Sequence, residues 1–305
     1  MYKVFIDGSA GTTGLRIYDR LSERKDIKLL TLPEQLRKDE KARCEMLNSA
    51  DIVFLCLPDD AARQAVSMIE NPAVKVIDTS TAHRTADGWE YGFPELFGRS
   101  EKIASSKRIA NPGCHASGFI SLVEPLIRAN LINKDIRLTC FSLTGYTGGG
   151  KKMIAEYEGE KPLLYEAPRQ YALSQSHKHL PEMQAVCGLD SAPLFCPVVA
   201  DFPCGMEVTV PLFACDLKGK ISDIADCYKA YYSGGIVKFV CNDEGGFLSA
   251  GAYSGKDGMG ISVYGNEDRI LLVSRFDNLG KGASGAAIQN MNILLGEDPA
   301  KGLIL

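Results

Sequence analysis

The sequence predicts an α/β protein with a Rossmann-type, doubly wound parallel sheet and a second α+β domain that contains a mainly antiparallel sheet. Three observations predict this fold class. Short apolar or β-branched runs alternate with helical patterns through about the first hundred residues, as in parallel strands joined by crossover helices. After residue 113, longer apolar segments are separated by loops and only occasional helices, which favours antiparallel pairing. A chain of 305 residues also has room for two domains.

The predicted elements of the first part alternate in type from the amino terminus onwards. Each strand is a short apolar or β-branched run, and each helix has apolar residues at helical spacing. The strands are expected at residues 2–6, 27–32, 51–57 and 74–78, and the helices from about Gly14, through Cys44 and Leu47, and over residues 59–69. This order makes parallel pairing the expected arrangement.

The second part is predicted to contain longer strands and few helices. Strands are expected at residues 136–143, 207–213 and 270–276, and a helix over residues 119–129. The last helix is expected over residues 283–295, because Gly296 stops the helical pattern and Pro299 lies just beyond it.

Composition and charge narrow the classes of function. The chain is 45% hydrophobic and 24% charged, an ordinary globular composition that excludes disorder as the main state. A net charge of −4 gives no general attraction for nucleic acid or an anionic membrane, so neither partner is expected. The start of the chain lacks a secretory signal pattern, and no apolar run is long enough to span a membrane, which predicts a cytoplasmic protein.

The ten cysteines are scattered and form no C-x-x-C pair. Several lie inside apolar runs, as Cys56 and Cys196 do, and this placement is typical of small buried side chains. The close histidine pair, His177 and His179, is weak evidence for a zinc site. Neither a disulfide framework nor a metal site is therefore expected.

A glycine-rich turn follows the first predicted strand and opens the first helix. Gly8, Gly11 and Gly14 are spaced G-x-x-G-x-x-G, and Thr12 and Thr13 lie between the last two. Glycine lets the backbone approach a pyrophosphate, which the N–H groups of the helix N-terminus then bind. The turn therefore predicts a nicotinamide dinucleotide site. A plain turn is the alternative, because the usual spacing is G-x-G-x-x-G.

The end of the second predicted strand indicates which nicotinamide cofactor is bound. An NAD enzyme places a carboxylate there, on the ribose 2′-hydroxyl, whereas this strand ends in Leu30 and Thr31. The missing acid favours NADP. Arg16, Arg37 and Lys38 are candidate partners of the 2′-phosphate, with solvated surface residues as the alternative.

Residues 78–84 follow the fourth predicted strand, at the carboxyl edge of the sheet where cofactor contacts are made. Ser80 is expected to contact the cofactor. Arg84 is a candidate for binding a substrate anion, and a structural ion pair is the alternative for this side chain.

The glycine-rich segment at residues 144–151 follows another strand and precedes a short helical pattern. Its backbone N–H groups, that of Gly149 included, and the Lys151 ammonium are candidates for holding a phosphate. A flexible interdomain loop is the alternative interpretation.

The most specific stretch is Asn-Pro-Gly-Cys at residues 111–114, where a turn delivers Cys114 to the start of a helical pattern. A thiol there feels the positive end of the helix dipole, so its pKa is expected to fall. The free N–H groups of the first turn can also hold an oxyanion. Cys114 is therefore the predicted nucleophile, and one more small buried cysteine is the alternative.

A thiolate that attacks a carbonyl needs a proton partner, and the second polar cluster supplies candidates. His177 and His179 share a face if the segment is extended, and Pro181 with Glu182 indicates a helix start just after them. One histidine is expected to be the acid/base and the other its hydrogen-bonding neighbour. Two surface histidines are the alternative. Glu182 is predicted to lie at the substrate.

These motifs resemble a known family. The N-P-G-C stretch, the H-K-H-x-P-E cluster at residues 177–182, the glycine-rich start and D-N-L-G-K-G-A at residues 277–283 are together similar to the N-acetyl-gamma-glutamyl-phosphate reductases, in their shorter form, of the semialdehyde dehydrogenase superfamily. The similarity extends over nearly the whole chain. It implies an NADP-binding domain at residues 1–113, a catalytic and oligomerisation domain at residues 114–280, and a C-terminal helix at residues 281–305 that returns to the first domain.

The resemblance also implies roles for single residues. Cys114 corresponds to the nucleophile, and His177 or His179 to the acid/base, with His179 favoured. Asn278, Lys281 and Gly282, which lie in the D-N-L-G-K-G-A stretch, are implied in the nucleotide site. A homo-oligomer acting on a small-molecule substrate is implied as well.

The implied reaction reduces N-acetyl-glutamyl 5-phosphate with NADPH to the 5-semialdehyde and phosphate, through a thioester on Cys114, in arginine biosynthesis. Two departures from the family pattern stand beside the nucleophile. His115 occupies a position that is usually aromatic, and Ser117 replaces a usual threonine. His115 is expected to fill the aromatic position; stabilisation of the thiolate by this side chain is the alternative.

Three other functions compete with this one. An aspartate-semialdehyde dehydrogenase shares the fold and the chemistry, but its cysteine motif lacks the Pro-Gly lead. A reductase whose acyl phosphate is attached to a small acidic carrier protein would use the same motifs. A nucleotide-binding redox sensor without turnover would need the glycine-rich start, and the intact Cys114 with its histidines argues against it.

Overall fold

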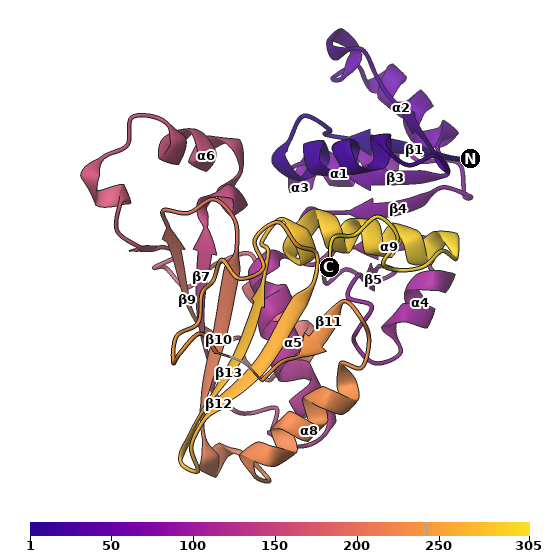
Figure 1. Ribbon diagram of the computed structural model, residues 1–305. Coiled ribbons are helices and arrows are strands. Elements are labelled where there is room, and N and C mark those ends of the chain that lie inside the picture. The colour runs from indigo at the N-terminus through magenta and orange to yellow at the C-terminus, as the bar shows by residue number, and fades with distance from the viewer. Residues whose placement is uncertain (242) are drawn as a thin grey trace. The chain divides into compact units, whose positions relative to one another are not determined.

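In the computed structural model, which describes residues 1–241 and 243–305, a six-stranded sheet has the order β2-β1-β3-β4-β6-β5 (Figure 1). Each of the strand pairs recorded for this sheet is parallel. The chain order reverses on the two sides of β1, which confirms the predicted doubly wound sheet. The strands are β1 (Tyr2–Asp7), β2 (Ile27–Leu30), β3 (Ile52–Leu55), β4 (Lys75–Asp78), β5 (Glu90–Tyr91) and β6 (Arg108–Ala110).

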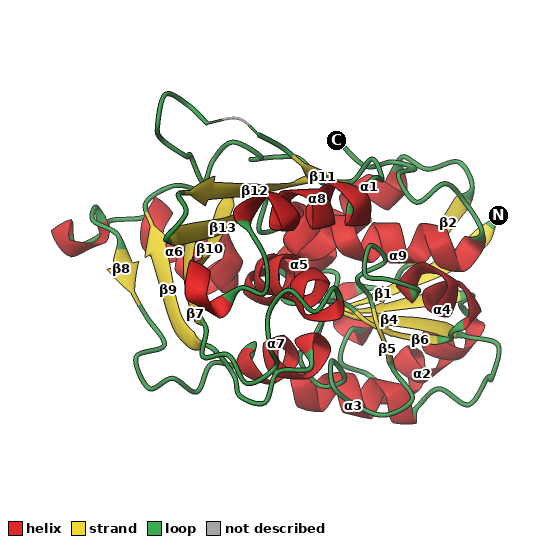
Figure 2. Cartoon of the chain, turned by 90° about the horizontal axis from the view of Figure 1, so that it is seen from below, coloured by secondary structure: helices red, strands yellow, loops and turns green. Residues whose placement is uncertain are grey.

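Helices cover both faces of this sheet (Figure 2). Successive strand side chains point to opposite faces, so Val4 and Ile6 pack in one core layer and Phe5 in the other. The layer of Val4 includes residues of α1 (Thr12–Ser22), α4 (Arg99–Ser105) and α9 (Gly285–Leu295). The layer of Phe5 includes residues of α2 (Glu40–Ser49) and α3 (Asp59–Ser67).

The described residues group into two compact units. The first consists of Met1–Pro94, Gly98–Pro112 and Ala283–Leu303, so α9 packs with the parallel sheet although it comes last in the chain. The second consists of Glu95–Phe97, Gly113–Gly282 and Ile304–Leu305.

The second unit is built on a mixed sheet whose described strands number seven, in the order β11-β12-β13-β10-β7-β9-β8. The pairs β11–β12 and β7–β9 are parallel, and the other pairs are antiparallel, as predicted for a mainly antiparallel sheet. Its strands are β7 (Thr139–Gly145), β8 (Arg169–Gln170), β9 (Leu194–Ala200), β10 (Met206–Phe213), β11 (Val237–Phe239), β12 (Met259–Gly265) and β13 (Arg269–Phe276).

Helices α5 (Cys114–Arg128) and α8 (Ile221–Tyr231) pack against this sheet, α5 on β10 and β13 and α8 on β11 and β12. The remaining helices of the unit are α6 (Gly150–Glu158) and α7 (Leu180–Cys187). Short 3-10 turns lie at η1 (Glu34–Leu36), η2 (Tyr146–Gly149), η3 (Leu163–Tyr165) and η4 (Ala214–Asp216), and a π-helical turn, η5 (Gly280–Ser284), leads into α9. None of the helices in residues 1–241 and 243–305 combines the length and the apolar composition that crossing a membrane requires.

Candidate active site

The glycine-rich turn lies at the carboxyl end of β1, beside β3, where the strand order reverses. Gly8 has φ +88°, and a Cβ there would lie 2.2 Å from the carbonyl oxygen of Cys56. A Cβ on Gly14 would lie 2.4 Å from the carbonyl oxygen of Gly8. The tight path of this turn therefore requires glycine at both positions.

The turn presents polar groups that suit the diphosphate of a nicotinamide dinucleotide. Gly11 is the N-cap of α1 and has no side chain to occupy the free N–H groups of the first turn. The Thr12 hydroxyl oxygen is buried and has no hydrogen-bond partner among the residues that the structure describes. An oxyanion at this helix end would satisfy these groups, so the residues present fit the cofactor.

The predicted 2′-phosphate partners lie on the same unit. Thr31 directly follows β2 and is exposed, as are Arg37 and Lys38 just beyond η1. Arg16 is half-buried on α1. Asp7, at the end of β1, is buried and bound to the Arg43 guanidinium at 2.8 Å.

Ser80 and Arg84 are both held by the carboxyl edge of the parallel sheet. Asp78 accepts hydrogen bonds from the Ser80 N–H and hydroxyl, at 2.9 and 2.7 Å, and its second oxygen also contacts His83 at 2.6 Å. The Arg84 guanidinium donates to the carbonyl oxygens of Asn111, at 3.0 Å, and Thr79, at 3.2 Å. Arg84 is thus tied to the N-P-G-C stretch through its backbone.

Cys114 is the first residue of α5, and Gly113 is the N-cap. The side chain is half-buried, unlike the fully buried Cys140. A Cβ on Gly282 would lie 2.9 Å from the Cβ of Cys114, so the D-N-L-G-K-G-A segment passes directly against the thiol-bearing residue. The thiol therefore sits at a helix N-terminus, as its sequence context predicts.

Glu182 links the cysteine turn to the histidine cluster. Its side chain is 1% exposed, and one carboxylate oxygen accepts the N–H of Gly113 at 3.2 Å. The other oxygen lies 4.0 Å from Nε2 of His179. A buried carboxylate at this place is suited to orienting the imidazole of His179 and the turn before Cys114.

The histidine cluster is a turn that leads into α7, in agreement with the helix start predicted just after His179. His179 is the N-cap of α7 in the αR conformation, and its N–H donates to Nδ1 of His177 at 3.2 Å. The helix start that Pro181 imposes bends the backbone two residues early. The ring centroids of His177 and His179 are nevertheless only 4.7 Å apart.

His115 joins the same cluster. Its ring centroid lies 5.7 Å from that of His177 and 5.5 Å from that of His179, and it packs edge-on against Phe195 at 5.2 Å. Burial lowers the pKa of His115 to about 3, and the nearby His177 acts in the same direction. The imidazole is therefore neutral and fills the aromatic position without a charge that would stabilise a thiolate.

Residues 277–282 are fixed by hydrogen bonds within the second unit. Asp277 accepts the N–H groups of Leu279 and Gly280, at 2.7 and 3.0 Å. The amide of Asn278 donates to the Thr147 hydroxyl at 3.0 Å and accepts the N–H of Gly205 at 2.9 Å. Asn278 and Gly282 thus hold the backbone close to the 144–151 segment and to Cys114.

Lys281 is 1% exposed, and its ammonium donates to both carboxylate oxygens of Glu95 at 2.8 and 2.7 Å. Burial lowers the pKa of Lys281, and the charge of Glu95 opposes this effect. A buried pair of this kind fixes the segment, because breaking it leaves an uncompensated charge.

The 144–151 segment forms η2 and the start of α6. Gly149 lies against Met153, since a Cβ there would meet the Met153 sulfur at 2.4 Å, and Lys151 is exposed on α6. The Thr147 hydroxyl, which binds Asn278, also donates to the carbonyl of Pro203 at 2.6 Å. The structure therefore brings this segment to Asn278.

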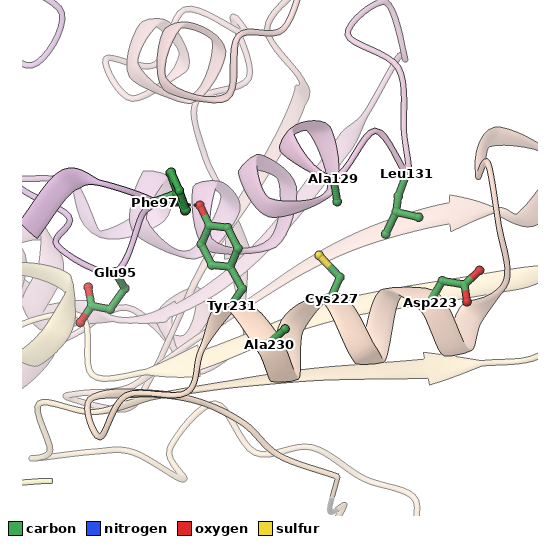
Figure 3. Close-up of a pocket in the computed structure, with 8 residues that line it drawn as sticks. All are labelled: Glu95, Phe97, Ala129, Leu131, Asp223, Cys227, Ala230 and Tyr231. Atoms are coloured by element: carbon green, nitrogen blue, oxygen red, sulfur yellow. Dashed lines mark hydrogen bonds between the residues drawn. The ribbon is translucent and has the colours of Figure 1, made fainter.

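An apolar pocket of about 520 Å³ lies elsewhere on the second unit, beside α8 and the end of α5 (Figure 3). Tyr231, Ala230 and Cys227 line it from α8, with Phe97 and Glu95 at one end. Its lining contains none of the predicted catalytic residues. This pocket is therefore not the candidate active site.

Sequence reasoning missed three residues that the structure brings to these groups. Tyr171 contacts His115 through its hydroxyl, Ser142 contacts the same imidazole from β7, and Glu95 binds Lys281. These contacts join positions 27 to 186 residues apart, so neither spacing nor periodicity signals them.

Comparison with known proteins places these features in context. Residues 3–106 match the family described as semialdehyde dehydrogenase, NAD binding domain, and residues 114–278 match semialdehyde dehydrogenase, dimerisation domain. The chain is 45% identical to an N-acetyl-gamma-glutamyl-phosphate reductase 2 from Nostoc, with 99% of each chain covered. It is 46% identical to an N-acetyl-gamma-glutamyl-phosphate reductase from Brucella ovis, with 97% of this chain and 99% of that protein covered.

Solved structures share the fold at much lower identity. Aspartate semialdehyde dehydrogenase II from Vibrio cholerae, in complex with ASA, superposes with a TM-score of 0.74 at 16% identity, covering 97% of this chain and 98% of that chain. Aspartate semialdehyde dehydrogenase with NADP from Candida albicans gives a TM-score of 0.70 at 15% identity, covering 97% and 99%.

Proposed function

We propose, since the chain belongs to the semialdehyde dehydrogenase family and within it to the N-acetyl-gamma-glutamyl-phosphate reductases, that it reduces N-acetyl-glutamyl 5-phosphate to the 5-semialdehyde and phosphate in arginine biosynthesis. The observation that carries the chemistry is Cys114 at the N-terminus of α5, with Glu182 joining its turn to His179. The cytoplasmic location of this reaction stays a prediction.

Cys114 acts as the nucleophile in this proposal. Its sulfur attacks the acyl carbon, the bond from that carbon to the phosphate oxygen breaks, and inorganic phosphate leaves with the electron pair. The product is a thioester on Cys114. The N–H groups of the first turn of α5 stabilise the oxyanion that forms during attack, because they point along the helix axis without an internal partner.

His179 donates the proton to the substrate oxygen and accepts it again. A nicotinamide dinucleotide held by the glycine-rich turn would supply the hydride that reduces the thioester. His179 donates a proton to the substrate oxygen as the hemithioacetal forms, then takes that proton back as the C=O bond re-forms and the carbon–sulfur bond breaks, which releases the semialdehyde and the Cys114 thiolate. Glu182, 4.0 Å from Nε2 of His179, orients the ring for this exchange.

The activity is tested by phosphate-dependent reduction of NADP with N-acetyl-glutamate semialdehyde, beside aspartate semialdehyde. We expect turnover with the acetylated substrate and little with aspartate semialdehyde. Preference for aspartate semialdehyde would contradict the proposed substrate. Turnover only with a substrate attached to an acidic carrier protein would do the same.

We expect NADPH to bind more tightly than NADH. The exposed Thr31 follows β2 where an NAD enzyme carries an acid, so no carboxylate repels the 2′-phosphate. Measured dissociation constants of the two reduced cofactors check this. The matched variant Thr31→Asp should weaken NADPH and strengthen NADH. Equal binding of the two cofactors by the unmodified protein would show that the missing acid was misread, with Glu34 as the replacement carboxylate.

We also propose a homo-oligomer that forms through the open face of the mixed sheet. Pairing register puts Phe141, Leu271 and Phe213 on one face, since Thr209 pairs with Phe141 and Pro211 with Leu271. These apolar side chains are 41%, 43% and 62% exposed. An apolar sheet face of this kind is typical of a protein–protein interface.

The double variant Phe141→Arg and Leu271→Arg should therefore reduce the oligomer to monomers, because each places a charge in the interface. Light scattering after size-exclusion chromatography measures the mass. Leu36→Arg, on an exposed residue of the first unit, is the control and should leave the mass unchanged. An unmodified protein that runs as a monomer would contradict the proposal.

A further inference from the structure

The main chain of Ile304 binds the loop that precedes β12 in the second unit. The Asp257 N–H donates to the Ile304 carbonyl oxygen at 2.6 Å, and the Ile304 N–H donates to the Asp257 carboxylate at 2.9 Å. Asp257 is 0% exposed, whereas Ile304 is 58% exposed, and both residues belong to the second unit. The contact therefore depends on backbone groups of Ile304 and hardly on its side chain.

The same loop lies against the D-N-L-G-K-G-A segment. The Gly255 N–H donates to the Asp277 carboxylate at 2.5 Å, and the other oxygen of this carboxylate accepts the Gly280 N–H at 3.0 Å. The carbonyl oxygen of Lys256 lies so close to Gly280 that a Cβ at this position would overlap it. The two residues before Asp257 therefore contact the segment at two positions.

The D-N-L-G-K-G-A segment in turn reaches Cys114. Gly282 donates its N–H to the Asp277 carbonyl oxygen at 3.0 Å. A Cβ on Gly282 would lie 2.9 Å from the Cβ of Cys114, so its backbone packs directly on the thiol-bearing residue. Because Asp277 binds Gly255 with its carboxylate and Gly282 with its carbonyl, a displacement of the loop would be transmitted to the backbone beside the thiol.

Burial makes the hydrogen bonds of Asp257 costly to lose. A carboxylate removed from water needs hydrogen-bond donors, and the Ile304 N–H is one of them. Asp257 also acts on Lys281 in the D-N-L-G-K-G-A segment. Burial lowers the pKa of Lys281, and the charges of Glu95 and Asp257 oppose this effect. Asp257 thus joins Ile304 to the segment through its charge as well as through the neighbouring backbone.

We propose that Asp257 and, through its main chain, Ile304 are positioning residues for Cys114, because they hold the loop that fixes residues 277–282 against it. The inference rests on the proposed role of Cys114 as nucleophile. A thiol reacts fast only when its sulfur is held at the acyl carbon in the correct orientation, and small displacements cost a large factor in rate. Asp257 and Ile304 act on that orientation through the Gly282 backbone.

The test uses proline, which lacks the N–H that the Asp257 carboxylate accepts. Ile304→Pro should speed the alkylation of Cys114 by iodoacetamide about 3- to 10-fold, the factor that corresponds to one lost hydrogen bond, because the Gly282 backbone shields the thiol less. Ile304→Ala is the matched control. It keeps the N–H and removes only an exposed side chain, so the rate should not change. The rate is measured on the full-length protein by mass spectrometry of the Cys114 peptide.

Cys140 distinguishes a local effect from unfolding. It is 0% exposed on β7 of the same unit, so it reacts only when the unit opens. Its alkylation should stay as slow in Ile304→Pro as in the unmodified protein. The increase at Cys114 should be the same at neutral and at alkaline pH, since it reports access to the thiol and not its ionisation. Parallel acceleration of Cys140 would overturn the proposal.

The kinetic signature is a split between kcat and KM. Ile304→Pro should lower kcat for the acyl phosphate about 3- to 10-fold and leave its KM nearly unchanged, because the orientation of the thiol matters after the substrate is bound. A loss confined to KM would place the effect in substrate binding and contradict the positioning role.

A second set of variants tests Asp257 itself. Asp257→Asn keeps an oxygen that can accept the Ile304 N–H, so it should retain more turnover and more protection of Cys114 than Asp257→Ala. The double variant Asp257→Ala with Ile304→Pro should match Asp257→Ala alone, because both changes remove the same hydrogen bond. An unchanged Cys114 rate in Ile304→Pro, or effects that add in the double variant, would show that these residues do not position the thiol.

These readouts are separate from the substrate assay. If the unmodified protein reduces no N-acetyl-glutamyl phosphate, the proposed function fails, but the alkylation rates still report on the position of residues 277–282 at Cys114. If turnover of the unmodified protein is normal and neither the alkylation rate nor kcat changes in Ile304→Pro, the inference fails and the proposed function remains.

Discussion

Replacing Cys114 with serine is expected to abolish reduction of the acyl phosphate while leaving the fold and cofactor binding intact. A serine hydroxyl has no thiolate character near neutral pH, so it cannot form the acyl intermediate at a useful rate. The substitution is nearly isosteric, and Cys114 is half-buried at the start of α5, so little packing is lost. Steady-state turnover and NADPH binding, measured on the same preparation, check the result.

Two cysteines serve as controls for this variant. Cys56, beside the glycine-rich turn, has its pKa raised to about 12 by burial and is therefore a thiol at working pH. Cys196 is half-buried on β9. Serine at either position should change stability and leave turnover intact. Near-normal turnover of Cys114→Ser would remove this residue from the role of nucleophile.

The variant His179→Asn is expected to lower turnover by about 10²- to 10⁴-fold, the range associated with general acid–base groups, and to change substrate binding less. His179 is 5% exposed at the N-cap of α7, with the Glu182 carboxylate 4.0 Å away. Asparagine keeps a polar side chain of similar size but exchanges no proton. The pH profile of turnover should lose the limb that reports the ionisation of His179.

The comparison variant is His177→Asn, which should reduce turnover less. Nδ1 of His177 accepts the N–H of His179 at 3.2 Å, so this nitrogen is engaged in shaping the turn. A larger loss in His177→Asn would mean that the two roles are reversed. Full activity of both variants, with an unchanged acidic limb, would leave neither histidine as the acid/base.

Local sequence was sufficient to predict the position of the cysteine. The turn residues before Cys114 and the apolar pattern after it predict a helix that begins at or near this residue, and α5 begins at Cys114. The glycine-rich turn was predictable for the same reason. Gly8 passes close to the backbone of Cys56, and Gly14 passes close to the backbone of Gly8, so both positions need a residue without a Cβ. Such features depend on the residues next to them in the chain.

The histidine segment was predictable only in part. Pro181 and Glu182 indicate a helix start just after His179, where α7 begins, but they do not indicate the turn that brings the rings of His177 and His179 to 4.7 Å. Lys281 is a second example. The resemblance implies that it belongs to the nucleotide site, which stays a prediction, and only the structure pairs its ammonium with Glu95, which is 186 residues away in the chain. No pattern in the sequence indicates the contact between Lys281 and Glu95.

The parallel sheet, its glycine-rich turn and the thiol at a helix start are predictable from the sequence, because hydrophobic periodicity and turn chemistry act over a few residues. The surroundings of the thiol depend on contacts between segments that lie far apart in the chain. Glu182 reaches Gly113, and His115 bonds both Ser142 and Tyr171, because packing of the mixed sheet against α5 brings these separate segments together.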